Sequence, residues 1–366
     1  MHVLSVVGIL REISGSICVI SGRMPQGVSV GEGVHTRTLR ITTHLRAFSR
    51  PAWLSALRWA VSYVAGQVEM AWHVVRLSRE FDIVVFYEGA HQYALPIVVA
   101  KLLRKKIVKY STGLMALEGS YSRLSIDYWA GYMFRVFERT SHALSDRVVV
   151  PTGADPERIG MGKYAGKVST AMYMFVADSF RERKNWNARD NVVGYVGRLV
   201  AIKGVIQLAQ AIPLMLQAKR DLRFLIVGDG VLMGDMKTCL QEAGCLDRVT
   251  FVGWVPNESI PDYLNEMKFH ILPSPFEAPG AINLEAMACG TIAIANGVGG
   301  IPDIVMDNQT GFLVDGNEPR IIADRVVEVW DSPDLDRIRR NAADFVRRSF
   351  SKQSVVNSWR QVLEGL

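Results

Sequence analysis

The feature that most restricts the fold is a regular alternation of short apolar runs and helix-compatible segments in the second half of the chain. Runs of this length that are rich in β-branched and aromatic residues indicate buried strands. Strands that alternate with helices favour a parallel, doubly wound α/β sheet. The predicted strands are Val192–Val196, Phe224–Val227, Val249–Val252, Phe269–Leu272, Thr291–Ala295 and Phe312–Val314.

The length of the chain indicates two domains, because 366 residues exceed what one hydrophobic core usually serves. Thr152–Asp190 is rich in Gly, Lys, Arg and Asn, and we place the boundary within it. The sequence therefore predicts a first domain at residues 1–170 and a second at 171–348. Asp334–Ser349 and Lys352–Leu366 are predicted to be helices.

The first half of the chain is less regular. Pro51–Arg79 and Asp127–Ser145 are predicted to be helices. His35–Thr43 alternates as a strand does, but a helix that opens on the preceding glycine loop is the alternative. The predicted strands here are Val3–Ile9, Ile17–Ile20, Phe81–Tyr87, Ile107–Tyr110, Arg147–Val150 and a short one at Tyr173–Val176.

Charge is distributed unevenly. Residues 1–180 have 21 Lys/Arg and 13 Asp/Glu, hence 21 − 13 = +8, whereas residues 181–366 have 21 and 23, hence 21 − 23 = −2. A basic surface attracts anionic lipid or acidic substrates. Pro51–Arg79 combines tryptophans with arginines, which suits an anionic membrane surface, and a core helix is the alternative. No aromatic and basic recognition motif accompanies the charge, so we expect no nucleic-acid partner.

The cysteines do not indicate a metal site. Cys18, Cys239, Cys245 and Cys289 lack C-x-x-C spacing, so neither zinc nor a disulfide framework is expected. Met1–Gly22 is interrupted by charge and lacks a basic leader, which argues against a signal peptide. We therefore expect a cytoplasmic protein, or one peripheral on the inner face of the membrane.

One stretch of the second domain has the order of a ligand site. Ser274–Pro279 has turn composition and follows the predicted strand Phe269–Leu272. Gly280–Cys289 is then helix-compatible and ends at Gly290. The amide groups and the positive dipole end at the start of such a helix attract anions. Phosphates and sugar hydroxyls are the expected ligands.

Two glutamates occur in this stretch. Glu277 precedes the helix, and Glu285 lies in its second turn. Carboxylates accept hydrogen bonds from paired hydroxyls such as those of ribose or a hexose. The alternative for an isolated E-x7-E pair is a solvated loop residue and an ordinary helix residue, but the strand, turn and helix around this pair favour a site.

A second element follows the first strand of the same domain. Arg198 and Lys203 flank the turn between Val192–Val196 and the next helix. An arginine fork and a lysine point charge can hold a diphosphate. Such cations usually face solvent, but these two are expected at the same sheet edge as Glu277 and Glu285.

Polar residues also follow the predicted strands of the first domain. His91 comes after Phe81–Tyr87 and is a candidate acid, base or hydroxyl-orienting residue, with a structural hydrogen bond at a helix start as the alternative. A weak G-x-G motif lies upstream, for which a plain turn is the alternative. The acceptor-side candidates are Gly31 and Gly33 of that motif, and Ser111 and Thr112 after Ile107–Tyr110.

Several motifs occur in an order that resembles the donor domain of glycosyltransferase family 4, the retaining group 1 enzymes of GT-B fold. The resemblance covers Asn191–Trp330 and is diffuse elsewhere. The motifs are Gly197-Arg198-Leu199 with Lys203-Gly204, Val227-Gly228-Asp229-Gly230, Phe251-Val252-Gly253, Glu277 and Glu285 with Ala286-Met287-Ala288-Cys289-Gly290, Gly299-Gly300-Ile301-Pro302-Asp303, and Thr310-Gly311-Phe312-Leu313-Val314.

The resemblance implies an α/β GT-B fold with two Rossmann-like, doubly wound domains that face a cleft. A C-terminal helix, here residues 349–366, crosses back to the first domain in that family. The reaction implied is transfer of a hexose from a nucleotide diphosphate sugar by front-face substitution, in which the leaving phosphate helps to deprotonate the acceptor. No metal is required in this picture, and the chain has no D-x-D ligand motif.

The resemblance also implies roles for particular residues. Arg198 and Lys203 neutralise the leaving diphosphate, and Glu277 holds the donor hexose. Glu285 binds the ribose hydroxyls. The other donor-binding residues implied are Gly197, Gly228, Pro279, Gly280, Ala281 and Ile282.

The chain departs from the family pattern at two positions. Ser111-Thr112 stand where the family often has a histidine after a strand, so His91 or a hydroxyl would take that role. Asp303 replaces the common glutamate and is one methylene shorter.

The predicted function is a retaining hexosyltransferase that uses a UDP, GDP or ADP sugar and an acceptor that is a glycan, lipid-linked or membrane-proximal. The alternatives are a non-catalytic sugar-nucleotide-binding protein and a sugar-nucleotide epimerase or phosphorylase on the same fold. The E-x7-E pair and the Arg198 to Lys203 segment argue against the two other enzymes.

Overall fold

A computed structural model describes residues 2–14, 17–21, 34–38, 52–87, 94–111, 136–151, 156–157, 161–277 and 280–366. The chain divides into two compact units. Unit 1 consists of Met1–Met174 and Val355–Leu366, and unit 2 of Phe175–Ser354. The sequence predicts a domain boundary after residue 170, and in the structure the first segment of unit 1 ends at Met174.

Unit 2 is built on a parallel sheet of six strands in the order β12-β11-β10-β7-β8-β9. The predicted strands are confirmed to within one residue at each end, and the class is α/β as expected. The strands are β7 (Val192–Val196), β8 (Arg223–Val227), β9 (Val249–Gly253), β10 (Phe269–Leu272), β11 (Ile292–Asn296) and β12 (Phe312–Val314).

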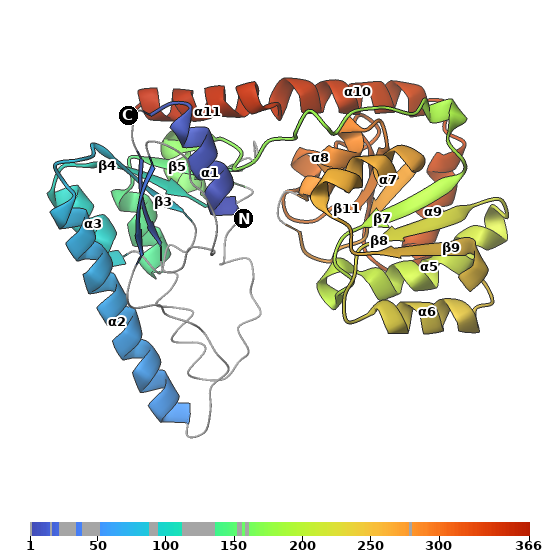
Figure 1. Cartoon of the computed structure of the whole chain (residues 1–366), viewed down its shortest axis with the longest axis horizontal. Helices are drawn as coiled ribbons and strands as arrows, with labels where there is room; N and C mark the ends of the chain where they lie inside the picture. The colour runs from blue at the N-terminus through green and yellow to red at the C-terminus, as the bar shows by residue number, and fades with distance from the viewer. Residues whose placement is uncertain are drawn as a thin grey trace. The chain divides into compact units, whose positions relative to one another are not determined.

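Helices cover both faces of this sheet, as expected for parallel strands that are buried on both sides. Helix α5 packs beside α6 and α9, and α8 packs beside α7 and α10. Figure 1 shows α7 and α8 on one side of the strands and α5 and α6 on the other. The helices are α5 (Val205–Ala218), α6 (Met233–Glu242), α7 (Ile260–Glu266), α8 (Ala281–Ala288), α9 (Pro319–Trp330) and α10 (Leu335–Ser349).

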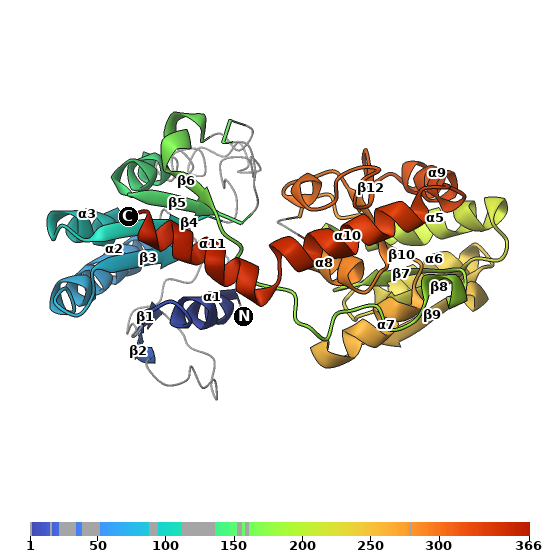
Figure 2. The same cartoon turned by 90° about the horizontal axis from the view of Figure 1, so that it is seen from above.

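Unit 1 contains a four-stranded parallel sheet and a separate parallel pair, β1 with β2. Figure 2 shows the four strands in their order, β3-β4-β5-β6. The strands are β1 (Ile17–Ser21), β2 (Val34–Thr38), β3 (Ile83–Tyr87), β4 (Lys106–Tyr110), β5 (Arg147–Val150) and β6 (Val168–Thr170), and the helices are α1 (His2–Arg11), α2 (Ala52–Arg76), α3 (Ala94–Leu102) and α11 (Lys352–Glu364).

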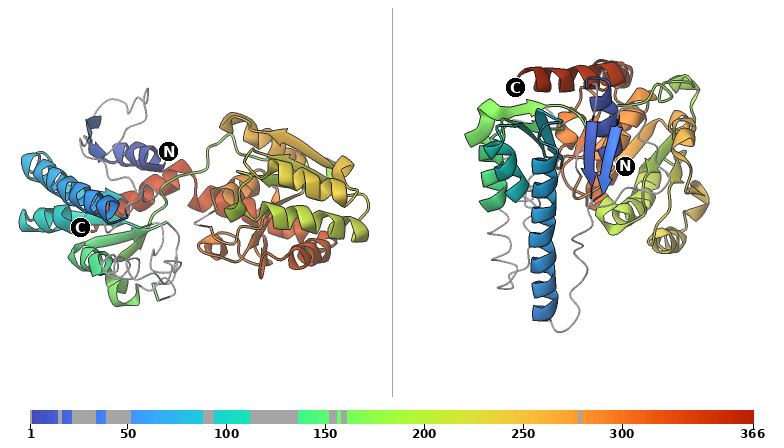
Figure 3. Two further views of the ribbon diagram at one scale, coloured as in Figure 1. Left: turned by 90° about the horizontal axis from the view of Figure 1, so that it is seen from below. Right: turned by 60° about the vertical axis from the view of Figure 1, so that its left-hand side comes forward.

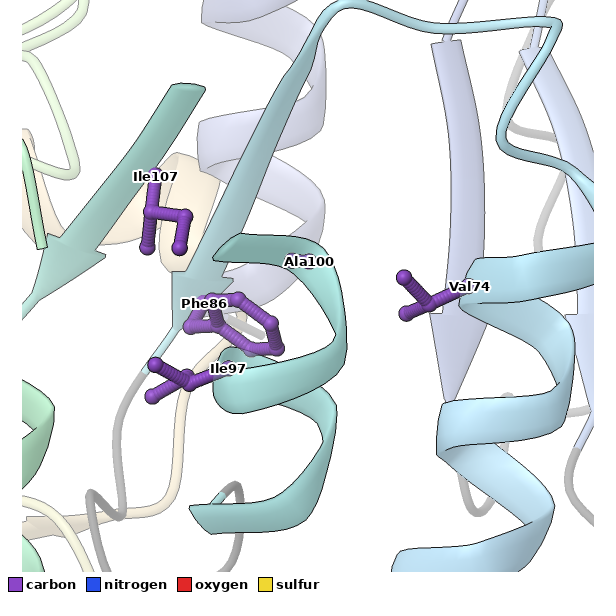
Figure 4. Packing of buried hydrophobic residues seen from close by; sticks show 5 residues of the cluster. All are labelled: Val74, Phe86, Ile97, Ala100 and Ile107. Carbon is purple, nitrogen blue, oxygen red and sulfur yellow. The ribbon is translucent and has the colours of Figure 1, made fainter. Parts of the chain in front are cut away.

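A compact apolar cluster joins the helices of unit 1 to its sheet. Val74 of α2 lies with Phe86 of β3 and Ile107 of β4, and α3 contributes Ile97 and Ala100 (Figure 4). All five side chains are buried. The cluster therefore fixes one face of α2 and one face of α3 against the sheet.

The last helix, α11, belongs to unit 1. The Trp359 ring is fully buried and stacks on Tyr110 of β4, with ring centroids 5.7 Å apart. Its Nε1 donates a 2.8 Å hydrogen bond to the carbonyl oxygen of Met172. A helix that follows unit 2 in sequence thus forms part of the unit 1 core, and Figure 3 shows α11 from two further sides.

Two strand predictions were wrong. Val3–Ile9 lies in helix α1, where Val6 and Ile9 are buried at helical spacing and Gly8 between them is exposed. Tyr173–Val176 joins no sheet, although Tyr173 and Val176 are buried; the Val176 N–H donates to the Phe350 carbonyl instead. A short apolar run alone cannot separate strand from buried helix or linker.

The remaining predictions for unit 1 agree with the structure where it describes them. Residues 136–144 of the predicted helix Asp127–Ser145 are helical. The described part of His35–Thr43 belongs to strand β2, which confirms the strand interpretation. No helix in the described ranges is long and apolar enough to cross a membrane.

Candidate functional site

The candidate site lies at the carboxyl edge of the unit 2 sheet. Numbered within that sheet, the strands run in the order 3-2-1-4-5-6, and the order reverses between β7 and β10, which are neighbours. Ligands of open α/β sheets bind outside the carboxyl ends of the strands at such a reversal. The loops that follow β7 and β10, residues 197–204 and 273–280, therefore flank the expected ligand position.

These two loops are joined by an ion pair. The Lys203 ammonium group pairs with Oε2 of Glu277, and Ser274 Oγ donates a 3.2 Å hydrogen bond to the same oxygen. The side chains of Lys203 and Glu277 are only 21% and 14% exposed. The structure thus brings together two residues that the sequence placed at one edge, and it adds Ser274, which the sequence showed only as part of a turn.

Arg198 lies in the loop after β7 that also carries Lys203. Its side chain is exposed and has no hydrogen-bond or ion-pair partner among the described residues. Its backbone carbonyl accepts a 2.9 Å hydrogen bond from the Tyr195 hydroxyl. Burial and the charge of Glu277 raise the pKa of Tyr195, while Arg198 opposes that shift. Tyr195 therefore stays a neutral donor between the two charged side chains.

Helix α8 points its N-terminus into the same loop region. Gly280 is the N-cap at φ +61°, and no side chain caps the helix. The amides of the first turn, among them Ala281 and Ile282, therefore lack helical partners and carry the positive dipole end. At the other end, Gly290 at φ +72° donates to the Met287 carbonyl, as expected of a glycine that terminates a helix.

Glu285 is a largely buried carboxyl in the second turn of α8. Burial raises its pKa to about 7. Its carboxyl group makes no hydrogen bond or ion pair with any residue that the structure describes. A buried carboxyl without a protein partner is suited to accept hydrogen bonds from a ligand, since leaving it unsatisfied is costly.

Two glycines allow the loops to approach each other. A Cβ on Gly228 would lie 1.9 Å from the carbonyl oxygen of Gly197, so the loops after β7 and β8 touch through their backbones. Gly299, at φ +56°, brings the loop after β11 equally close to the carbonyl oxygen of Glu277. In the sequence Gly299 is recognisable only as part of a motif, and the contact identifies its part in positioning Glu277.

Exposed apolar side chains gather at this edge. In the described part of unit 2, the large hydrophobic side chains that are exposed belong to four loops, those after β7, β8, β9 and β10. Exposed apolar side chains in such loops can contact the apolar parts of a ligand. These side chains are Ile202, Val231, Trp254 and Phe276.

The remaining predicted site residues lie in unit 1 or outside the described residues. Ser111 is a buried residue at the end of β4 in unit 1, where its N–H donates to the Val149 carbonyl. Gly31, Gly33, His91, Thr112 and Pro279 lie outside the described residues. Within the described ranges, no group of three His, Cys, Asp or Glu side chains is placed to hold a metal ion.

The comparisons with known proteins concern mainly unit 2. Residues 176–345 match the family model "Glycosyl transferases group 1". A 2-deoxystreptamine glucosyltransferase of Streptomyces kanamyceticus is 37% identical over 142 residues, which is 39% of this chain and 37% of that protein. An alpha-D-kanosaminyltransferase of the same organism is 33% identical over 172 residues, which is 47% of this chain and 44% of that protein. The chain thus spans less than half the length of these relatives.

Solved structures resemble the whole chain. Anabaena HepE in complex with UDP and glucose has a TM-score of 0.69 at 17% identity, with 100% of this chain and 96% of that chain covered. A sucrose-phosphate synthase of Thermosynechococcus elongatus has a TM-score of 0.70 at 19% identity and covers 100% and 92%. These similarities, together with the two parallel sheets, confirm the predicted GT-B fold class.

Proposed function

Because residues 176–345 belong to the group 1 glycosyltransferases, we propose that this chain transfers a hexose from a nucleotide diphosphate sugar to an acceptor hydroxyl. The observation that carries the proposal is the arrangement at the carboxyl edge of unit 2. There the Lys203–Glu277 pair lies beside the uncapped start of α8 at the sheet's reversal point. Cations and free amides favour a diphosphate, and carboxyl groups favour sugar hydroxyls.

In the proposed reaction, the bond between the anomeric carbon and the diphosphate oxygen breaks as the acceptor oxygen bonds to the same face of that carbon. The acceptor proton passes to an oxygen of the leaving diphosphate. Because the new bond forms on the face that the diphosphate leaves, the configuration is retained. Lys203 and Arg198 stabilise the negative charge of the leaving group, and Glu277 positions the hexose. Catalysis by such placed charges needs no metal in this proposal.

The acceptor is proposed to be a glycan hydroxyl on a lipid-linked or membrane-proximal molecule. The positive charge of residues 1–180 supports an acceptor at an anionic surface. UDP is the first nucleotide to examine, because HepE, whose fold is similar, has been solved with UDP and glucose.

The test is a transfer assay with UDP, GDP and ADP sugars in EDTA, with alkyl glycosides and polyprenyl-linked sugars as acceptors. We expect one nucleotide sugar to be consumed and NMR of the product to show the donor's anomeric configuration. An inverted product contradicts the mechanism. Nucleotide binding without transfer or hydrolysis would favour the non-catalytic alternative, which is motivated by Ser111 at the place of a family histidine.

Donor affinity is expected to rise with pH because of Glu285. Its pKa of about 7 is above the usual carboxyl value, so the empty site holds a proton below that pH. Sugar hydroxyls that donate to the carboxylate favour the ionised form, and binding then releases the proton. The affinity should rise by up to about tenfold per pH unit below pH 7 and level off above it. Titration calorimetry with a nucleotide sugar, whose diphosphate does not titrate there, measures this dependence.

The control is Glu285→Gln, in which the affinity should be lower and independent of pH over the same range. Equal pH slopes in the two proteins would show that another group takes up the proton. The same carboxyl makes empty unit 2 less stable as pH rises from about 4.5 to 7, because over this range it ionises in the unfolded chain but stays protonated in the folded one.

A further inference from the structure

Helix α2 has an exposed apolar face between Val61 and Val75. Val61, Val64, Val68, Trp72 and Val75 are each between 50% and 62% exposed. Their spacing of three or four residues places them on one side of the helix, over about 21 Å at 1.5 Å per residue. A helix on the surface of a globular protein usually carries polar residues on its outer side.

A neighbouring side of α2 is already used for packing. Ala71, Val74 and Leu77 are buried, and Val74 belongs to the unit 1 core. The apolar residues of α2 therefore form two faces, of which the sheet explains one. The exposed face needs a separate explanation.

Helix α3, which packs beside α2, also carries exposed apolar side chains. Leu95, Val98 and Leu102 are exposed at helical spacing, with Leu102 at 77%. The two helices lie side by side (Figures 2 and 3), and the Leu95 N–H donates a 3.1 Å hydrogen bond to Gln67 Oε1 of α2. We call these eight side chains the α2–α3 apolar face: Val61, Val64, Val68, Trp72, Val75, Leu95, Val98 and Leu102.

Exposed arginines lie at the C-terminal ends of the two helices. Arg76, Arg79 and Arg104 form no ion pair with any residue of the described ranges. The Arg76 guanidinium lies over the ring of Trp72, 5.0 Å from its centroid. Tryptophan beside arginine at the margin of an apolar surface is typical of the membrane interface, where the ring and the cation meet the headgroups.

We propose that the α2–α3 apolar face docks on a membrane leaflet that contains anionic lipid, with α2 and α3 lying in its interface. An anionic leaflet supplies both the apolar environment and the counter-charge for the three arginines. A second copy of this chain could cover the apolar side chains but would not supply the negative charge. Residues 1–180 carry +8, so two copies of this region repel each other. The membrane proposal rests on the proposed function in one respect, because the lipid-linked acceptor proposed above would be presented at this leaflet.

The experiment is flotation of the full chain with vesicles of phosphatidylglycerol and phosphatidylcholine, compared with phosphatidylcholine alone. Wild type should float with the anionic vesicles, and added salt should weaken the binding. Val64→Asp with Val68→Asp should abolish flotation. Arg76→Gln, Arg79→Gln and Arg104→Gln together should lower vesicle affinity about 100-fold, at about fivefold for each arginine.

Matched controls separate this face from general surface effects. Trp254→Ser, at an exposed tryptophan of unit 2, should leave flotation unchanged, whereas Trp72→Ser should reduce it. Arg340→Gln, Arg347→Gln and Arg348→Gln remove three exposed arginines of α10 and should have little effect. Equal losses in the α10 and α2–α3 variants would overturn the proposal.

Other outcomes are also decisive. Wild type that fails to float, or a dimer in solution that Val68→Asp dissociates, overturns the proposal. Circular dichroism melts of each variant report whether unit 1, which carries the α2 and α3 substitutions, is folded, and nucleotide binding reports the same for unit 2. Flotation without any nucleotide binding would leave the membrane face supported and the proposed function refuted, so the two failures are distinguishable.

Discussion

Replacement of Lys203 by methionine is expected to lower kcat/KM for the nucleotide sugar by about 100- to 1000-fold. Methionine keeps most of the length of the side chain but removes the charge proposed to meet the leaving diphosphate. It also leaves Glu277 without its ion-pair partner, so the carboxylate that positions the hexose is held only through Ser274 among the contacts described. Steady-state kinetics with the donor varied measures the loss.

The matched control is Lys219→Met. Lys219 also lies in unit 2 and pairs with a carboxylate, that of Asp331, but away from the candidate site at the end of α5. Its loss should change kcat/KM less than about twofold, since surface ion pairs contribute little. Equal effects of the two substitutions would show that Lys203 acts through stability and not through the donor.

The largest effect on stability is expected for Arg189→Met. The Arg189 side chain is buried and donates to the carbonyls of Met267 and Cys289 at 2.8 and 2.7 Å. It also donates to Thr291 Oγ1 at 2.9 Å. These acceptors lie just beyond the C-terminal ends of α7 and α8, where a cation opposes the negative dipole end. Arg189 thus stabilises the C-terminal end of α8, whose N-terminal end lies at the candidate site.

The substitution should lower the free energy of unfolding of unit 2 by about 3–5 kcal/mol, because several buried carbonyls lose a charged donor. Urea titration followed by hydrogen exchange of peptides from β10 and β11 measures this loss. Arg340→Met, at an exposed site on α10, is the control and should change stability by less than about 0.5 kcal/mol. If β10 and β11 are equally protected in both variants, Arg189 does not hold these helices.

The strands of unit 2 could be predicted closely because the apolar runs in its sequence are the segments that are buried in the structure. β10 is buried at all four positions, so its strand is a continuous apolar run bounded by turn residues. In unit 1, α1 carries a similar run of valine, leucine and isoleucine, but the run forms a helix. Residue propensity does not distinguish a strand from a helix here, because tertiary packing determines which structure buries such a run.

The candidate site was predictable where its residues share a local motif. Glu277, the start of α8 and Glu285 follow one another along the chain, and Lys203 lies in a second short motif. What the sequence could not show are contacts between distant segments, such as Arg189 with Thr291, 102 residues apart. The approach of Gly299 to Glu277 is likewise a backbone contact that no residue pattern reveals.

The most direct test of the donor site is equilibrium binding of UDP, GDP and ADP in EDTA to wild type, Lys203→Met, Glu285→Gln and the Lys219→Met control. One nucleotide should bind to wild type and to the control, and each site variant should bind it at least tenfold more weakly. At a hundredfold excess over its Kd, that nucleotide should stabilise the protein by about 2.7 kcal/mol. If none of the three nucleotides binds to wild type, the carboxyl edge of unit 2 is not a donor site and the account is wrong.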